Sequence, residues 1–146
     1  MGAKFLIIAG RFNEMISNQL LVGARDVLAE AGFGDQAVDI VWVPGAYEMP
    51  CIAGVAARSK KYAAIITLGA VIRGETPHFD FVAGEAASGL MKVSVETGVP
   101  VVFGVLTTNT TEQALARSGL KGGNNGRSAA STALSMIKTI EKLTRS

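Results

Sequence analysis

The sequence predicts a single α/β domain with a four-stranded parallel sheet in the order 2-1-3-4 and helices on both faces. Short apolar runs alternate four times with segments of helical periodicity. Each strand–helix–strand unit implies a parallel pair joined by a right-handed crossover. The 146 residues are the usual size of one domain, so residues 1–146 are taken as one unit. A hydrophobic content of 49% supplies a core without disulfides.

Four apolar runs predict the strands of this sheet. Each run is compact and bounded by polar, Gly or Pro residues, as expected of strands that are covered on both faces. In chain order the predicted strands are Lys4–Ala9, Val38–Val43, Ala63–Leu68 and Val101–Leu106.

Helical periodicity fills the intervals between the strands. The predicted helices run from about Glu14 to Gly32, from Glu48 or Met49 to about Lys60, from after Phe79 to Gly98, from Asn109 to Ser118 and from about Arg127 to Thr144. Pro50 fits the second helix only because it lies in the first turn. Asn13 or Ser17 could cap the first helix, and residues 109–112 resemble a capping box at the start of the fourth.

Composition excludes several classes of protein. The 14 basic and 12 acidic residues are spread along the chain and leave a net charge of +2, which argues against nucleic-acid binding. The single cysteine leaves no disulfide framework and no multi-Cys metal site and fits a reducing compartment, and the single histidine leaves no poly-His metal site. Cys51 is expected to be a small buried hydrophobe. Without a signal sequence or an apolar run of roughly 20 residues, we expect a cytoplasmic protein and no membrane partner.

The predicted topology is a flavodoxin-like three-layer sandwich, and it locates a ligand site before any chemistry is considered. In such sheets ligands bind beyond the carboxyl ends of the strands, where the winding reverses. That point lies between the first and third strands. Segments 10–13 and 69–78 are therefore the predicted site, with segment 44–48 beside them.

Several side chains in these segments could bind a ligand or move protons. His78 is the only imidazole, the group that ordinarily changes charge near neutral pH, and it is either a general acid/base or a histidine at a helix cap. Phe12 could stack on a planar ring or simply pack. Glu48 could bind a polyol hydroxyl or favour the helix start. Segment 74–76 leads into a helix, where free amide groups would hold an anion.

Arg117 ends the predicted fourth helix. A guanidinium there suits a bidentate phosphate contact, but a cation also favours the end of a helix for purely structural reasons. From the residues alone, the sequence predicts a small-molecule site for an aromatic, anionic ligand and names no reaction.

Four segments resemble motifs of the lumazine synthase family: 11–13, 42–50, 69–80 and 103–108. Glu112-Gln113-Ala114 with Arg117 continues the match, which covers nearly the whole chain. The resemblance implies a transferase in the penultimate step of riboflavin biosynthesis. This enzyme condenses 5-amino-6-(D-ribitylamino)uracil with 3,4-dihydroxy-2-butanone 4-phosphate to give 6,7-dimethyl-8-ribityllumazine, phosphate and water. The resemblance implies no cofactor and no metal.

The resemblance also implies a role for each matching residue. His78 would be the proton carrier. The residues around the pyrimidine ring and the ribityl chain would be Phe12, Asn13, Ala46, Tyr47, Glu48, Ala70, Val71 and Ile72. Glu75 and Thr76 would bind the phosphate of the four-carbon substrate. Phe103 and Arg117 would come from the neighbouring subunit, where Phe103 closes the pocket and Arg117 pairs with the phosphate.

Two positions depart from the family pattern. The family often reads Gly-Asn-Lys-Gly where this chain has Asn125 at the third position, so a cation that would help hold the phosphate is lost. We expect activity with a poorer affinity for the phosphate substrate. Tyr47 replaces a family Phe, a change we expect to be neutral.

The family resemblance implies a homo-oligomer. Its active site forms between adjacent subunits of a pentamer, and many members pack twelve pentamers into a hollow shell. This chain has no insertion before its last helix, which permits the sixty-subunit shell; a free pentamer or a decamer stays open, as does association with riboflavin synthase. The alternative function is a catalytically weak flavin- or lumazine-binding shell protein, favoured only by Asn125.

Overall fold

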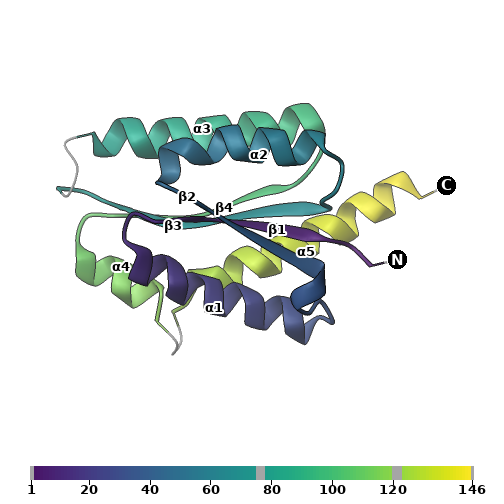
Figure 1. Ribbon diagram of the computed structural model, residues 1–146, viewed down its shortest axis with the longest axis horizontal. Helices are drawn as coiled ribbons and strands as arrows, with labels where there is room; N and C mark the ends of the chain where they lie inside the picture. The colour runs from purple at the N-terminus through teal and green to yellow at the C-terminus, as the bar shows by residue number, and fades with distance from the viewer. Residues whose placement is uncertain (1, 75–77, 120–122, 146) are drawn as a thin grey trace.

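The computed structural model describes residues 2–74, 78–119 and 123–145, which alternate between strands and helices (Figure 1). The strands are β1 (Phe5–Gly10), β2 (Val38–Val43), β3 (Ala64–Ile72) and β4 (Val101–Thr108). The helices are α1 (Glu14–Glu30), α2 (Met49–Arg58), α3 (Phe79–Thr97), α4 (Thr111–Arg117) and α5 (Asn125–Thr144). Two 3-10 turns, η1 (Asp35–Ala37) and η2 (Ala46–Glu48), lie at the ends of β2.

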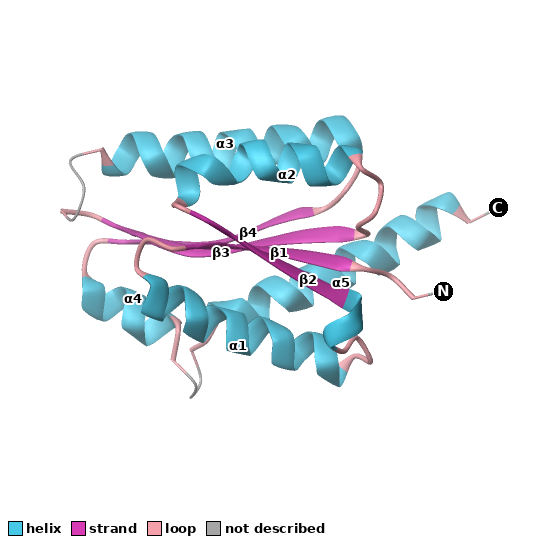
Figure 2. Ribbon diagram, viewed as in Figure 1, coloured by secondary structure: helices cyan, strands magenta, loops and turns pink. Residues whose placement is uncertain are grey.

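The four strands form one parallel sheet in the order β2-β1-β3-β4, as predicted. Helices α2 and α3 cover one face, and α1, α4 and α5 cover the other (Figure 2). The carboxyl ends of the strands therefore meet at one edge of a three-layer sandwich, and the winding reverses between β1 and β3.

The core lies on both sides of the sheet, because alternate residues of each strand point to opposite faces. Phe5 and Ile7 belong to the cluster under α1 and α5, whereas Leu6 and Ile8 belong to the cluster under α2 and α3. Every residue of β1 and β3 is buried, as predicted for strands that are covered on both faces.

Two strands run further than the sequence predicted. β3 continues past Leu68 to Ile72, and β4 continues past Leu106 to Thr108. The reason is their mutual pairing, which extends as far as Ile72 opposite Thr108, after the pairing of β3 with β1 has ended at Leu68. The end of β3 therefore projects beyond β1 as half of a two-stranded ribbon.

The predicted helix caps are partly wrong. Asn13 occupies the N-cap position of α1 but makes no side-chain cap hydrogen bond, and its backbone is left-handed, with φ 60°. The N-cap of α4 is Thr110: its hydroxyl accepts from the Gln113 amide, and the Gln113 side chain accepts from the amide of Asn109, the residue before the cap. The prediction that Cys51 is buried is also wrong, because it lies on the exposed face of α2.

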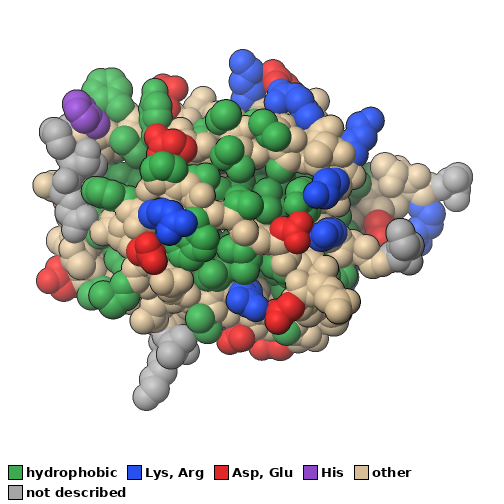
Figure 3. All heavy atoms as spheres, in the orientation of Figure 1, with side chains coloured by type: hydrophobic (Ala, Val, Ile, Leu, Met, Phe, Trp, Pro, Cys, Tyr) green, Lys and Arg blue, Asp and Glu red, His purple; other side chains and the backbone are tan. Residues whose placement is uncertain are grey.

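Hydrophobic side chains gather on the face of the molecule around α2 and the edge strand β2 (Figure 3). Val41, Tyr47 and Val55 are among the exposed ones. On α3, Phe81, Met91 and Val95 are also exposed. None of the helices that the structure describes is long and apolar enough to cross a membrane.

Candidate active site

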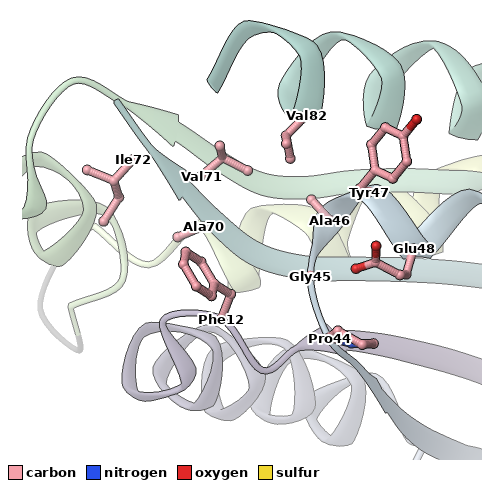
Figure 4. Close-up of a pocket in the computed structure, with 10 residues that line it drawn as sticks. All are labelled: Phe12, Pro44, Gly45, Ala46, Tyr47, Glu48, Ala70, Val71, Ile72 and Val82. Atoms are coloured by element: carbon pink, nitrogen blue, oxygen red, sulfur yellow. The ribbon is translucent and has the colours of Figure 1, made fainter. Parts of the chain in front are cut away.

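A cavity of about 260 Å³ lies at the carboxyl ends of the strands, at the predicted reversal of winding (Figure 4). It is formed by the segment after β1, the turn after β2, the end of β3 and the first turn of α3. The described residues that line it are Phe12, Pro44, Gly45, Ala46, Tyr47, Glu48, Ala70, Val71, Ile72 and Val82. Seven of the predicted site residues are brought together here.

Phe12 presents its ring to this cavity because the backbone holds it there. The Arg11 amide donates to the Val43 carbonyl at 2.8 Å, and the Phe12 amide donates to the Pro44 carbonyl at 2.9 Å, so the pairing of the first two strands continues past their ends. The ring is 57% exposed and is directed toward Ala70 (Figure 4). An exposed aromatic face of this kind can stack on a planar ring.

Asn13 lies beside the cavity without lining it. Its left-handed backbone turns the chain from β1 into α1, and its side-chain amide donates to the Ala70 carbonyl at 3.3 Å. This hydrogen bond ties the end of β1 to the projecting end of β3. Ser17 supports the same turn by donating to the Gly10 carbonyl at 2.7 Å.

The turn after β2 supplies one wall with a single carboxylate. In η2, Ala46 is buried against the core, whereas Tyr47 and Glu48 are exposed. Met49, the first residue of α2, is completely buried and anchors the turn. The Glu48 carboxylate is an acceptor that suits the hydroxyl groups of a polyol.

The end of β3 supplies backbone hydrogen-bonding groups. Backbone groups of successive residues in a strand point to opposite sides. The amides of Ile65 and Arg73 donate toward the β4 side, to Pro100 and Thr108. The backbone groups of Ala70 and Ile72 therefore point to the other side, beyond the last residue of β1 that pairs with β3, where the Ala70 carbonyl accepts from Asn13.

His78 lies at the rim of this region, one helical turn before Val82. It occupies the N-cap position of α3, and its carbonyl accepts from the Val82 amide at 2.9 Å. The side chain is exposed, with its ring 6.4 Å from that of Phe81. It is not among the described lining residues of the cavity. The predicted phosphate-binding residues Glu75 and Thr76 lie outside the described residues.

The remaining predicted site residues lie elsewhere on the chain. Phe103 is 38% exposed on β4, the strand at the other edge of the sheet from β2, and lines a separate cavity of about 210 Å³ together with Asn125 of α5. Arg117 is exposed at the last residue of α4. None of these three side chains lines the first cavity of its own chain.

Three lining residues were not among the predicted site residues: Pro44, Gly45 and Val82. The first two belong to the segment after the second strand that was expected beside the site. Val82 lies in the first turn of α3 and was not expected at the site. The signal that could have found it is its place in the first turn, since this part of α3 overhangs the strand ends.

Comparison with known proteins agrees with this geometry. The family model of 6,7-dimethyl-8-ribityllumazine synthase matches residues 2–141. A relative of that name from Desulfotalea psychrophila is 56% identical over 142 residues, which are 97% of this chain and 92% of the relative. The matched region contains every residue of the cavity. The chain therefore belongs to the 6,7-dimethyl-8-ribityllumazine synthase family, and its activity is that of a lumazine synthase, a transferase of riboflavin biosynthesis.

Proposed function

We propose that the cavity at the carboxyl ends of the strands binds 5-amino-6-(D-ribitylamino)uracil. Phe12 would lie over the pyrimidine ring, and the backbone groups of Ala70 and Ile72 would hydrogen-bond its edge. The Glu48 carboxylate would accept hydrogen bonds from the ribityl hydroxyls. The support is the combination of the exposed Phe12 ring, one carboxylate and the edge of β3 beyond β1 around a cavity whose described lining is otherwise largely apolar.

The second substrate, 3,4-dihydroxy-2-butanone 4-phosphate, would bind next to the first with its phosphate at Glu75 and Thr76. His78 would carry protons during imine formation, loss of phosphate and ring closure. A side chain that gives and takes protons near ambient pH contributes about 10²–10⁴-fold to such steps. Holding the two substrates side by side supplies much of the remaining acceleration.

A neighbouring subunit would complete the site, and one observation carries this proposal. Among the described residues that line the cavity none is Lys or Arg, although a phosphate ester calls for a cation. The volume of about 260 Å³ is also below the roughly 300–1,000 Å³ of most ligand pockets. Arg117 and Phe103 would supply the cation and the closing ring from a second copy of the chain.

The described surface supports a ring of subunits. On α3, five apolar or small residues repeat at alternating spacings of three and four: Phe81, Gly84, Ser88, Met91 and Val95. All five are exposed in the single chain. A stripe with this spacing is the pattern by which helices of identical subunits pack together. We propose a homopentamer, which could assemble further into a sixty-subunit shell that associates with riboflavin synthase in the cytoplasm.

The experiment that tests this function mixes both substrates with the protein and follows phosphate release and lumazine fluorescence together. Wild-type protein is expected to release phosphate and form lumazine in step, and His78→Ala is expected to do so at least 10²-fold more slowly, the lower end of the usual contribution of such a group. Binding of lumazine or riboflavin without turnover by the wild type would instead support the catalytically weak shell protein. An unchanged rate in His78→Ala would refute the assigned role of the imidazole.

A further inference from the structure

Arg73 joins the ends of β3 and β4, which project beyond β1. It is the first residue after β3, and its backbone amide donates to the Thr108 carbonyl at 2.8 Å. Its side chain reaches onward from there: Nε donates to the Asn109 side-chain oxygen at 3.0 Å. The guanidinium group is thus fixed to the loop that follows β4.

The same guanidinium also contacts the start of α3. Its Nη2 atom lies 3.6 Å from the Asp80 carboxylate, and its Cζ atom lies 4.4 Å from the centre of the Phe79 ring. One planar group therefore links three things: the ends of β3 and β4, a carboxylate in the first turn of α3 and an aromatic face. An ammonium group has no fork with which to make these contacts together.

These contacts bear on the imidazole. His78 immediately precedes Phe79, and its carbonyl accepts from the Val82 amide, so its backbone belongs to the same first turn that Arg73 holds. Val82 lines the cavity, but Arg73 is not among the described lining residues. The arginine is therefore placed to act on the site through the helix start.

We infer that Arg73 is a positioning residue: it fixes the first turn of α3 against the strand ends, and thereby sets where the His78 imidazole stands relative to the bound substrates. The inference rests on the proposed role of His78. Displacement of a reacting group by about 1 Å can cost on the order of 10²-fold in rate. Loss of the guanidinium is therefore expected to lower kcat while leaving the KM values for both substrates largely unchanged.

The test is a double-mutant cycle of Arg73→Met and His78→Ala, with kcat and both KM values measured for each protein. Arg73→Met alone is expected to lower kcat by about tenfold to a hundredfold. In the His78→Ala protein the same change is expected to alter kcat by less than about twofold, because residues that act as a unit are not additive. An equal loss in both backgrounds, or an unchanged kcat in Arg73→Met, would overturn the inference.

Two further variants separate positioning from charge and from folding. Arg58→Met removes an equally exposed arginine from an ion pair with Glu96, 3.6 Å long, between α2 and α3. It is expected to leave kcat unchanged; a loss equal to that of Arg73→Met would mean that helix packing in general controls the rate. Arg73→Lys keeps the charge but not the fork and is expected to stay impaired, so full activity in this variant would contradict the inference.

The outcomes also separate this inference from the proposed function. If His78→Ala alone turns over as fast as the wild type, the role of the imidazole fails and the positioning role falls with it. If His78→Ala is slow but Arg73→Met adds its full effect to it, the function stands and only the inference about Arg73 is wrong. Thermal unfolding of each variant, with a midpoint close to that of the wild type, shows that the comparison is between folded proteins.

Discussion

Asn125 is the residue at which this chain departs most clearly from its family, and it lies in the second cavity, beside Phe103. If that cavity faces the neighbour's phosphate site, a cation at this position should strengthen the binding of the four-carbon phosphate. We predict that Asn125→Lys lowers the KM for 3,4-dihydroxy-2-butanone 4-phosphate by about tenfold, which corresponds to roughly 1.4 kcal/mol, with kcat and the other KM little changed.

Steady-state kinetics at fixed ionic strength check this prediction. Ser128→Lys is the matched control, because Ser128 lines the same second cavity on α5 and is exposed. It adds the same charge one helical turn away and is expected to have a smaller effect. An unchanged KM in Asn125→Lys would mean that this position does not face the phosphate.

The Tyr62–Asp39 pair gives the stability of the protein a pH dependence far from the active site. The Tyr62 hydroxyl donates to the Asp39 carboxylate at 2.6 Å, and Lys4 lies 3.4 Å from the same carboxylate oxygen. The hydrogen bond to the carboxylate, together with burial, raises the pKa of Tyr62 from 10.0 to about 12. The hydrogen bond from Tyr62, assisted by Lys4, lowers the pKa of Asp39 below its usual 3.8.

These two pKa shifts make the stability of the folded protein fall at high and at low pH. Because the folded-state pKa of Tyr62 is raised, its contribution is full below pH 10 and is lost as the pH rises toward 12. Because the pKa of Asp39 is lowered, its contribution is full above pH 3.8 and is lost as the pH falls through the folded value. We predict that Tyr62→Phe lowers the free energy of unfolding by about 1 kcal/mol at pH 7.

Urea unfolding at pH 7 and pH 11 checks this prediction, and the difference between wild type and Tyr62→Phe should shrink at the higher pH. Tyr47→Phe is the control, since the other tyrosine of the chain is 58% exposed and belongs to the cavity wall. A constant difference across this range would show that the hydroxyl does not act through its ionisation.

Much of the site could be predicted at the level of residues, and the rest depends on contacts across the fold. Phe12 and Glu48 were found because they lie in the segments that follow predicted strands, where the topology places ligands. The contacts of Arg73 could not be found in this way, since its partner Asn109 approaches it only when β3 and β4 pair to their ends.

At the scale of elements, the approach of α1 to α5 places a strict requirement on one glycine. A Cβ at Gly126 would collide with the Leu20 carbonyl oxygen of α1. Asn124 reinforces the contact, because its side-chain nitrogen donates to the Gln19 carbonyl at 2.9 Å and its oxygen accepts from the Gly126 amide at 2.8 Å. The backbones of α1 and α5 therefore lie in close contact at the start of α5, and the Asn124 side chain links them by hydrogen bonds.

We predict that Gly126→Ala destabilises the protein by about 2–3 kcal/mol, because the two helix backbones must separate to admit the methyl group. Equilibrium urea unfolding measures this. Gly34→Ala is the matched control: a Cβ there meets nothing within 4 Å, and its backbone is extended. Equal stabilities of the two variants would contradict the close approach of α1 and α5.

The sequence predicted the elements well and their ends less well. The number and order of the strands could be predicted because apolar runs and helical periodicity alternate along the chain, and both patterns can be read from short stretches of sequence. The last residues of β3 and β4 did not, because only their mutual pairing makes residues 69–72 a strand. The N-cap of α4 was predicted one residue too early for a similar reason. Both Asn109 and Thr110 can cap a helix, and only the folded backbone shows that the Thr110 hydroxyl accepts from the Gln113 amide.

At the scale of the whole molecule, the predicted site residues fall into two groups that one chain does not bring together. Phe12 and Glu48 line the first cavity, whereas Phe103 lines the second and Arg117 ends α4. If both groups belong to one site, the first cavity of one subunit must meet Phe103 and Arg117 of its neighbour, and a repeated head-to-tail contact of this kind forms a ring when its rotation closes. Activity measurements on mixed oligomers can therefore test whether the site is shared between subunits.

The most direct test combines two inactive variants, His78→Ala and Arg117→Ala, in the same oligomers by co-expression. Each variant alone should be nearly inactive. In mixed rings, a pocket with an intact His78 can face a neighbour with an intact Arg117, so about a quarter of the sites should regain turnover in an equal mixture. Recovery of lumazine formation toward that level is the predicted result. Activity no greater than that of the two variants kept separate would contradict a site shared between subunits.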